Sequence, residues 1–271
     1  MSATPSHPGH PIPGDHLQVL LVQATLGWKQ PAENRAHLED LLEQAQSPFD
    51  LAVFPETFTT GFLGDPDVPN EGMDGPTLEW MRELAVRHQG SLAGSAVIVE
   101  DGKRFNRFLL VTPAGDVHTY DKRHLFSYGG ENKRYAPGSQ RVTVPLGPWR
   151  TSLQVCYDLR FPAWCRHRGD FDLQIFVANW PASRVEHWQA LLRARAIENQ
   201  AWVIGLNRAG EDGNGIAYPG CSLIFDPLGE TVCELGAEEE TRLVSLDRSQ
   251  VEAVRGKFPF QADADPFTLQ T

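Results

Sequence analysis

The sequence has few cysteines, and none of them pair in a recognisable motif. There are only four in 271 residues, and no two have CxxC spacing, so neither a zinc knuckle nor a disulfide framework is indicated. We therefore expect no metal site, reduced thiols and a cytoplasmic protein. The four are Cys156, Cys165, Cys221 and Cys233.

Basic residues and long hydrophobic runs are also scarce. Lys and Arg number 24 against 35 Asp and Glu, which gives a net charge of -11. Phosphate binding needs clustered cations, so a nucleic-acid partner is not expected. The longest apolar runs, at 19–22 and 175–178, are short enough for strands, whereas a membrane-spanning helix needs about 18 or more apolar residues. No membrane partner is expected.

The two ends of the chain differ in composition from the body. Residues 1–16, MSATPSHPGHPIPGDH, lack the basic and apolar regions of a secretory signal, and their Pro, Gly and His content predicts a flexible tail. A metal-binding role for the tail histidines is the less favoured interpretation. Residues 261–271 are expected to form a C-terminal tail. The body is 17–260, and because no repeat or linker divides it, we expect a single α/β domain there.

Strand and helix patterns alternate through this body. Residues 17–26, LQVLLVQATL, predict a buried strand, and segment 31–46 carries apolar residues at helical spacing. Further helices are expected within 77–90, 187–200 and the second half of 241–258. Further strands are expected within 51–56, 91–100, 105–122, 150–158, 172–180, 201–210, 221–236 and the first half of 241–258. Units of the βαβ type mixed with hairpins indicate stacked sheets with helices outside.

Three reactive side chains follow predicted strand ends. They are Glu56 in VFPETFTTGF, Lys122 in YDKRHLF and Cys156 in LQVCYDLRFP. Binding crevices form at such strand ends in layered α/β folds, so convergence of the three is physically reasonable. Most free cysteines in strands are small buried hydrophobes. At Cys156, however, the apolar strand stops and a polar turn begins, which indicates a thiol that a substrate can reach.

Cleavage of an amide by a thiol needs a base, an acid for the departing ammonia and a positive group for the oxyanion. Glu56, Lys122 and the backbone N–H of Tyr157 fit these requirements, and the apolar surroundings of Glu56 favour a base tuned toward neutral pH. The other three cysteines lack comparable partners and are expected to be structural. No paired histidine is needed, which disfavours a papain-like site.

With these three blocks in this order, the sequence resembles the nitrilase superfamily of carbon–nitrogen hydrolases from residue 17 to about 260. The resemblance implies a four-layer αββα sandwich that forms a homodimer and uses no metal or organic cofactor. It also implies that Cys156 is the nucleophile, Glu56 the base and Lys122 the group that stabilises the tetrahedral intermediate. Glu131, in GGENKRYAPG, matches a second glutamate that the family places near the lysine.

Within the superfamily, CYDLRFP and VANWPASRVEHWQALLRARAIENQ are most similar to the omega-amidase branch. These enzymes hydrolyse the terminal amide of 2-oxoglutaramate or 2-oxosuccinamate. Because such substrates carry a carboxylate far from the amide, a cation should line the pocket, and Arg184 is the candidate; the alternative for Arg184 is a surface ion pair. Asn179 and Trp180 are expected to contact substrate, Phe58 to contact substrate or fill the core, and Arg160 to brace the turn after the cysteine.

The expected reaction is hydrolysis of a small 2-oxo dicarboxylate monoamide to the acid and ammonia through a cysteine thioester. One alternative is another activity of the same superfamily: an N-carbamoyl amino acid amidohydrolase, an aliphatic amidase or a nitrilase. A remote alternative is a binding protein that kept the fold without catalysis, because fold alone does not secure function.

Overall fold

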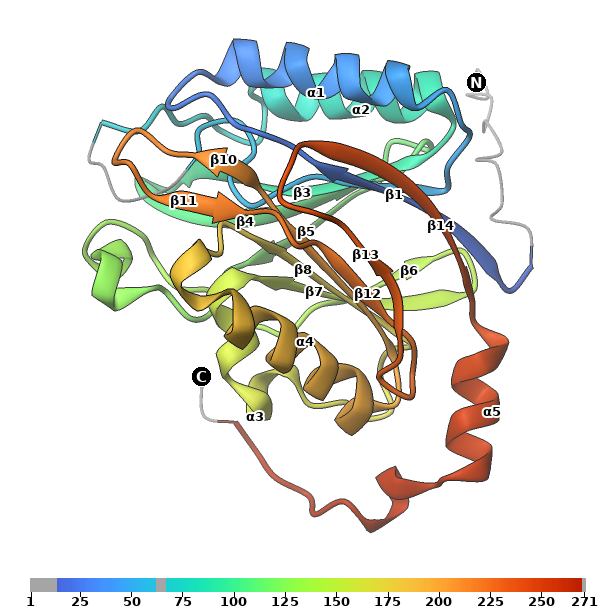
Figure 1. The fold of residues 1–271 in the computed structure, drawn as a ribbon. Coiled ribbons are helices and arrows are strands. Elements are labelled where there is room, and N and C mark those ends of the chain that lie inside the picture. Colours follow the sequence, from blue (N-terminus) through green and yellow to red (C-terminus); the bar gives the residue numbers. More distant parts are fainter. Residues whose placement is uncertain (1–13, 62–66, 270–271) are drawn as a thin grey trace, which may run out of the picture.

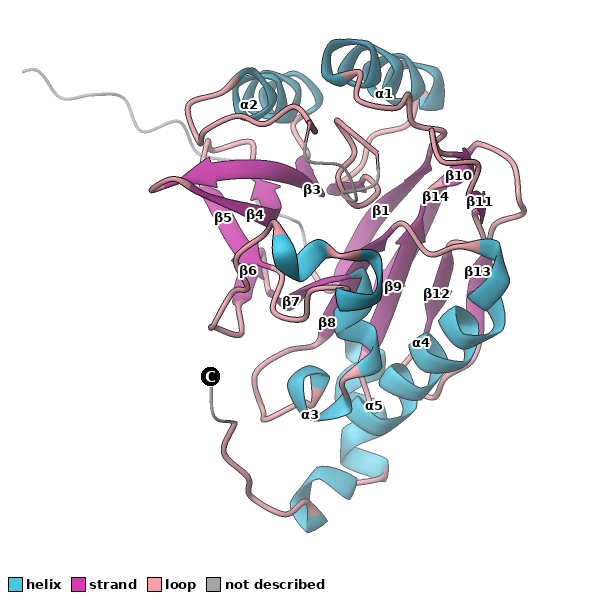
Figure 2. Ribbon diagram, turned by 90° about the vertical axis from the view of Figure 1, so that its left-hand side faces the viewer, coloured by secondary structure: helices cyan, strands magenta, loops and turns pink. Residues whose placement is uncertain are grey.

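The computed structural model describes residues 14–61 and 67–269. Two six-stranded sheets lie face to face, and helices cover their outer faces (Figure 1; Figure 2). This is the predicted αββα sandwich. Residues 1–13 of the predicted N-terminal tail lie outside the described residues, and His16, which the sequence assigned to that tail, opens the first strand.

The first sheet has the order β14-β1-β2-β3-β4-β5. Its centre is parallel, since β1 pairs parallel with β2 and β2 parallel with β3, whereas β14, β4 and β5 are antiparallel to their neighbours. The strands are β1 (His16–Gln23), β2 (Leu51–Val53), β3 (Ser91–Glu100), β4 (Lys103–Val111), β5 (Val117–Asp121) and β14 (Glu240–Asp247).

The second sheet has the order β13-β12-β9-β8-β7-β6 and a similar plan. Strands β7, β8 and β9 are parallel, and the remaining strands pair antiparallel. They are β6 (Thr143–Leu146), β7 (Trp149–Val155), β8 (Leu173–Ala178), β9 (Trp202–Asn207), β12 (Leu223–Phe225) and β13 (Thr231–Glu234).

Helices form the two outer layers (Figure 2). α1 and α2 lie over the first sheet, α3 and α4 lie over the second, and α5 follows β14. Each of α1 and α2 opens with a proline in its first turn, where the missing N–H would have no helical partner. The helices are α1 (Pro31–Ala45), α2 (Pro76–His88), α3 (Pro162–Cys165), α4 (Val185–Asn199) and α5 (Ser249–Lys257).

Strand β1 shows how the layers are built from sequence. Successive side chains of a strand point to opposite faces of the sheet. Leu17, Val19 and Leu21 therefore face the core between the two sheets, while Leu20 and Val22 face α1 and α2. A strand buried on both faces reads as a continuous apolar run, which is why this segment lacks polar alternation.

The sequence did not predict three of the strands. One is β6, and the others form the two-stranded ribbon of β10 (Ala209–Glu211) and β11 (Ala217–Pro219). Its turn is closed by Asp212, whose carboxylate accepts the backbone N–H of Asn214 and Ile216. Strands of three residues around a Gly-rich turn carry too little hydrophobic pattern to be recognised from sequence.

Within the described ranges, 14–61 and 67–269, the structure contains no helix both long and apolar enough to cross a bilayer.

Candidate active site

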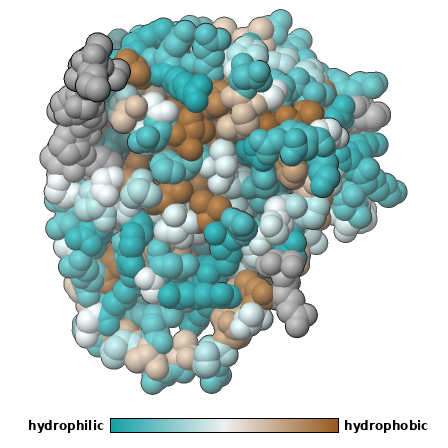
Figure 3. Space-filling model, turned by 180° about the vertical axis from the view of Figure 1, so that it is seen from behind, coloured by the Kyte–Doolittle hydropathy of each residue, from teal (hydrophilic) through white to brown (hydrophobic). Residues whose placement is uncertain are grey.

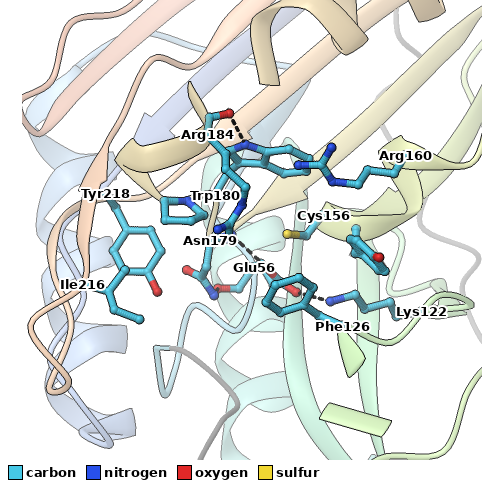
Figure 4. Close-up of a pocket in the computed structure, with 12 residues that line it drawn as sticks. Glu56, Lys122, Phe126, Cys156, Arg160, Asn179, Trp180, Arg184, Ile216 and Tyr218 are labelled. Atoms are coloured by element: carbon cyan, nitrogen blue, oxygen red, sulfur yellow. Dashed lines mark hydrogen bonds and ion pairs between the residues drawn. The ribbon is translucent and has the colours of Figure 1, made fainter. Parts of the chain in front are cut away.

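The three reactive side chains meet where strands of both sheets end. Glu56 lies three residues beyond β2, Lys122 directly follows β5, and Cys156 directly follows β7. Glu131 opens a short 3₁₀-helix, Glu131–Lys133, and reaches the same place. Figure 4 shows the Cys156 sulfur beside Glu56 and Lys122. The structure therefore brings together all four residues that the sequence assigned to catalysis.

Lys122 is held between two carboxylates. Its Nζ lies 2.9 Å from Glu56 Oε1 and 3.1 Å and 3.0 Å from the two carboxylate oxygens of Glu131. All three side chains are at most 2% exposed. Burial opposes the charge on Lys122, but the carboxylates of Glu131 and Glu56 outweigh it and hold the pKa of the ammonium well above its usual value. Lys122 therefore stays a cation at neutral pH.

The surroundings of Glu131 favour its neutral form, whereas those of Lys122 favour its charged form. Burial and the neighbouring charge of Glu56 raise the pKa of Glu131, while Lys122 and the Phe126 N–H, which donates to Glu131 Oε2 at 2.6 Å, act against the rise. Two carboxylates thus share one lysine in a buried site, and each additional hydrogen bond to them affects how easily both stay ionised.

Glu56 is also tied to the second sheet. Asn179, directly after β8, donates its backbone N–H to Glu56 Oε2 at 2.8 Å. The Asn179 side-chain amide donates to the backbone carbonyl of Glu56 at 3.1 Å and to Thr57 Oγ1 at 2.9 Å. Asn179 therefore fixes both the main chain and the carboxylate of Glu56.

Cys156 sits in a strained turn. Its φ is 44°, in the left-handed region that side chains other than glycine rarely adopt, and Thr57, beside Glu56, has φ 43°. The thiol is half-buried. Burial, together with the negative charge of Glu56, raises the pKa of the Cys156 thiol well above its usual value despite the opposing charge of Lys122. In the free protein the raised pKa keeps the sulfur protonated at neutral pH, so reaction of this thiol as a nucleophile would require a base.

This protonation state predicts how the free protein reacts with iodoacetamide. Because only the thiolate reacts, alkylation of Cys156 should be slow at pH 7 and should rise about tenfold per pH unit up to at least pH 9. Peptide mapping by mass spectrometry after timed labelling measures the rate at this one cysteine. A rate that is already constant below pH 8 would show that a preformed thiolate is present instead.

Asp158 links the cysteine turn to the lysine segment. Its buried carboxylate accepts the Val155 N–H at 3.1 Å, the Tyr120 hydroxyl at 2.7 Å and the His124 N–H at 2.9 Å. Tyr120 and His124 lie two residues before and two after Lys122. One carboxylate therefore sets the position of Cys156 relative to Lys122, a role that the sequence analysis did not assign.

A pocket of about 70 Å³ opens over Cys156, and its aromatic walls with a few polar and charged groups are typical of a small-molecule site. Tyr157, Asn179 and Trp180 line it. Arg184 lines it as well, with its guanidinium carbon 5.5 Å from the centre of the Phe126 ring. Within residues 14–61 and 67–269 no acidic side chain pairs with Arg184, so the surface ion pair considered as its alternative is not found.

Two further predictions differ from the structure. Arg160 was expected to brace the turn, but it lines the pocket, with its guanidinium carbon 4.8 Å from the Trp180 ring centre and Nη2 3.2 Å from His187 Nδ1. Phe58 does not line the pocket. It fills the core instead, beside Phe54 at a ring-centre distance of 5.4 Å.

The β3 backbone explains the position of Phe58. A Cβ added to Gly94 would lie 2.8 Å from the Phe58 ring, so the glycine leaves the space that this ring occupies. The sequence left core filling open as the alternative for Phe58, and this alternative is the one observed.

Sequence reasoning also missed other residues around the site. Ile216 and Tyr218 come from the β10–β11 ribbon and close one side of the pocket (Figure 4). Asn106, on β4, donates to Glu56 and Glu131. Asn106 and Arg107 are both polar residues inside the segment FNRFLLV, so Asn106 gave only a weak signal in the sequence, and the ribbon gave none. The described part of the chain holds no group of three or more His, Cys, Asp or Glu placed to bind a metal ion.

Comparison with known proteins agrees with this geometry. The profile of the carbon–nitrogen hydrolase family matches residues 18–256. The chain belongs to the carbon–nitrogen hydrolase family. It is thus an α/β hydrolase of the nitrilase superfamily that acts on carbon–nitrogen bonds of amides.

Two curated relatives and one solved structure are similar along most of this hydrolase. Omega-amidase YafV of Escherichia coli strain K12 is 44% identical, covering 95% of this chain and 100% of that protein. The 2-oxoglutaramate amidase of Bacillus subtilis is 31% identical, covering 88% and 93%. A CN-hydrolase superfamily protein from Xanthomonas campestris, whose crystal structure has an arsenic adduct in the active site, is 42% identical with a TM-score of 0.91, covering 94% and 99%.

Proposed function

We propose that this carbon–nitrogen hydrolase is an omega-amidase that releases ammonia from 2-oxoglutaramate or 2-oxosuccinamate. The observation that carries the proposal is the pair of guanidinium groups, of Arg160 and Arg184, in the pocket over Cys156. Neither has an acidic partner among the described residues, although the protein has a net charge of -11. A substrate carboxylate supplies the missing anion. The similarity to omega-amidases supports the same choice.

The first half of the reaction acylates the enzyme. Glu56 takes the proton of the Cys156 thiol as the sulfur attacks the amide carbon. The Lys122 ammonium and the Tyr157 N–H stabilise the oxyanion that forms on the amide oxygen. Glu56 then delivers its proton to the amide nitrogen, the carbon–nitrogen bond breaks, and ammonia leaves a thioester on Cys156.

The second half frees the acid. Glu56 accepts a proton from a water molecule while the water oxygen attacks the thioester carbon. The Lys122 ammonium and the Tyr157 N–H stabilise the second oxyanion. The carbon–sulfur bond breaks, and the thiolate recovers the proton from Glu56. Glu131 keeps Lys122 in place and balances its charge throughout. Asn179 orients Glu56, and Trp180 forms a wall of the substrate pocket.

The proposed role of Arg184 predicts a change of specificity. Arg184→Ala should lower kcat/KM for 2-oxoglutaramate roughly 10- to 100-fold, the value of one charge-assisted hydrogen bond, mainly through KM. Turnover of a small uncharged amide should stay within about threefold of the wild type. Steady-state ammonia release on both substrates provides the measurement.

Arg193→Ala is the matched control, because Arg193 lies on α4 and its guanidinium donates to Thr231 rather than lining this pocket. Equal loss on the charged and the uncharged amide in Arg184→Ala would argue against carboxylate binding. It would favour another amidase or nitrilase of the superfamily, for which apolar walls suffice.

Assembly and location are proposed on separate grounds. We infer a homodimer, and the apolar residues gathered in the middle of the face seen in Figure 3 offer a surface for a second copy. Light scattering at micromolar concentration tests this: a dimer mass supports it and a monomer mass contradicts it. A reducing cytoplasm is the proposed location, since the nucleophile must remain a free thiol and all four cysteines are unpaired.

A further inference from the structure

Glu56, Lys122 and Glu131 form a buried charged cluster, and the side chain of Asn106 contacts both of its carboxylates without a role in the mechanism proposed for the reaction. We infer that Asn106 is a positioning residue, which holds Glu56 and Glu131 ionised side by side so that Glu56 can act as the base. This inference rests on the proposed catalytic role of Glu56. It adds a residue that touches neither the substrate nor the sulfur and acts through the two carboxylates.

Asn106 contacts every charged member of the cluster. Its side-chain Nδ2 donates to Glu56 Oε1 at 2.7 Å and to Glu131 Oε1 at 3.3 Å. Its backbone carbonyl accepts the N–H of Lys122 at 3.0 Å. Strand β4 directs this side chain into the space between the sheets, the same side as Phe108 and Leu110 two and four residues later. One rigid strand position thus reaches three segments of the site.

The orientation of the Asn106 amide follows from its neighbours. Ionised carboxylates only accept hydrogen bonds, so the group facing both of them must be the NH₂. The opposite atom, Oδ1, is buried and has no hydrogen-bond partner in the described part of the chain. Asn106 itself is fully buried. An unpaired buried carbonyl is unfavourable, so the residue is better explained by its donor than by its fit in the core.

A neutral double donor addresses a specific electrostatic difficulty. Glu56 and Glu131 both contact the single ammonium of Lys122, and their like charges favour uptake of a proton. Glu56 Oε1 receives Lys122 and Asn106, which leaves Oε2 with the N–H of Asn179. Asn106 supplies a hydrogen bond to each carboxylate without adding charge, and this favours the ionised form that a base requires.

Among the described residues, the other titratable groups whose charges interact with the two carboxylates are Lys122, Cys156, Tyr135 and Tyr218. Burial raises the pKa of both tyrosines, with the charge of Glu131 adding to the rise at Tyr135 and that of Asp212 at Tyr218. Both tyrosines therefore stay neutral over an assay range of about pH 5 to 9. A change in the pH dependence of activity over this range on replacing Asn106 therefore reports on the carboxylates of Glu56 and Glu131 and not on the two tyrosines.

Two substitutions test the inference through the pH dependence of kcat/KM for 2-oxoglutaramate. Asn106→Leu removes the hydrogen-bond donor at every pH. We therefore expect kcat/KM at pH 7 to fall about 10²-fold, and the acid limb of the pH profile to move to higher pH because the pKa of the base rises. Asn106→Asp places a carboxyl group there, which donates only while protonated. Its activity relative to wild type should therefore fall as pH rises, opposite to the leucine variant.

Asn199 provides the matched control. It is also fully buried, and its amide accepts the His167 N–H at 2.9 Å and donates to the Cys165 carbonyl at 3.1 Å, away from the cluster. Asn199→Leu and Asn199→Asp should change stability and leave the shape of the pH profile unaltered. Rates are divided by the fraction of protein that is folded, measured by circular dichroism, so that misfolded protein is not counted.

The inference is overturned if both Asn106 variants keep the wild-type pH profile, whatever their absolute rate. If Asn106→Leu does not fold, the inference is tested by Asn106→Asp alone, through the change with pH of its activity relative to the wild type. Failure of the proposed function is a separate result, since it would appear as absence of ammonia release from 2-oxoglutaramate by the wild type.

Discussion

Replacement of Cys156 by alanine is expected to lower kcat for 2-oxoglutaramate by at least about 10⁴-fold, because it removes the atom proposed to form the acyl bond. The rest of the site should survive. Glu56, Lys122 and Glu131 hold one another by hydrogen bonds that do not involve the sulfur. The variant should therefore fold and bind substrate without turnover, which ammonia release and calorimetric titration measure together.

Cys233→Ala is the control for this substitution. Cys233 lies on β13 at the edge of the second sheet, and its thiol is buried away from the pocket. Its loss should leave kcat within about twofold, since a small buried cysteine acts as a hydrophobe. Retention of wild-type turnover in Cys156→Ala would refute the covalent mechanism outright.

The second large effect is expected at Lys122. Lys122→Met removes the only cation in contact with Glu56 and Glu131 among the described residues, and with it the proposed oxyanion donor. A single oxyanion donor contributes about 10²- to 10³-fold to kcat, and the loss of an ionised base adds to this. We expect kcat to fall by about 10³-fold or more, measured on the folded fraction.

The same substitution should change how stability depends on pH. Without Lys122, the pKa of Glu131, already above its ordinary value of 4.5, should rise further. A carboxyl group with a raised folded pKa contributes its stability below the unfolded pKa and loses it as pH rises through the folded one. The unfolding free energy of Lys122→Met should therefore decrease above about pH 4.5 more steeply than that of the wild type. Urea denaturation at several pH values measures this.

Lys133→Met is the comparison, since Lys133 is exposed on the same short helix as Glu131. It should change neither kcat nor the slope of stability against pH. A Lys122→Met variant that keeps both would show that the buried ion cluster has no part in catalysis or in setting the carboxylate charges.

Much of this fold and site could be predicted from sequence because the relevant signals are local. The continuous apolar run of β1 follows from burial of both faces of the strand. The spaced leucines of α1 follow from burial of one face of the helix. Glu56, Lys122 and Cys156 were found because each follows a predicted strand in a recognisable block of residues. Their positions at strand ends then required them to approach one another once the sheets stacked.

Other features depend on contacts between distant segments. Asn106 is one of four polar residues in β4, so nothing in the sequence singled it out, and its partners lie 50 and 25 residues away. Arg160 was assigned to the turn because it is close in sequence, whereas the side chain crosses to Trp180 and His187. Phe58 sits near Glu56 in sequence but points into the core, where Gly94 makes room. Such choices are set by packing, which sequence periodicity does not record.

The most direct test of the central claim is the mass of Cys156 during turnover. The enzyme is mixed with saturating 2-oxoglutaramate, quenched in acid within milliseconds to seconds, and digested for peptide mapping. We predict a 2-oxoglutaryl thioester on Cys156, none on the other three cysteines, and complete removal of the adduct by neutral hydroxylamine. An unmodified Cys156 in samples that are releasing ammonia, together with turnover by Cys156→Ala, would contradict the account.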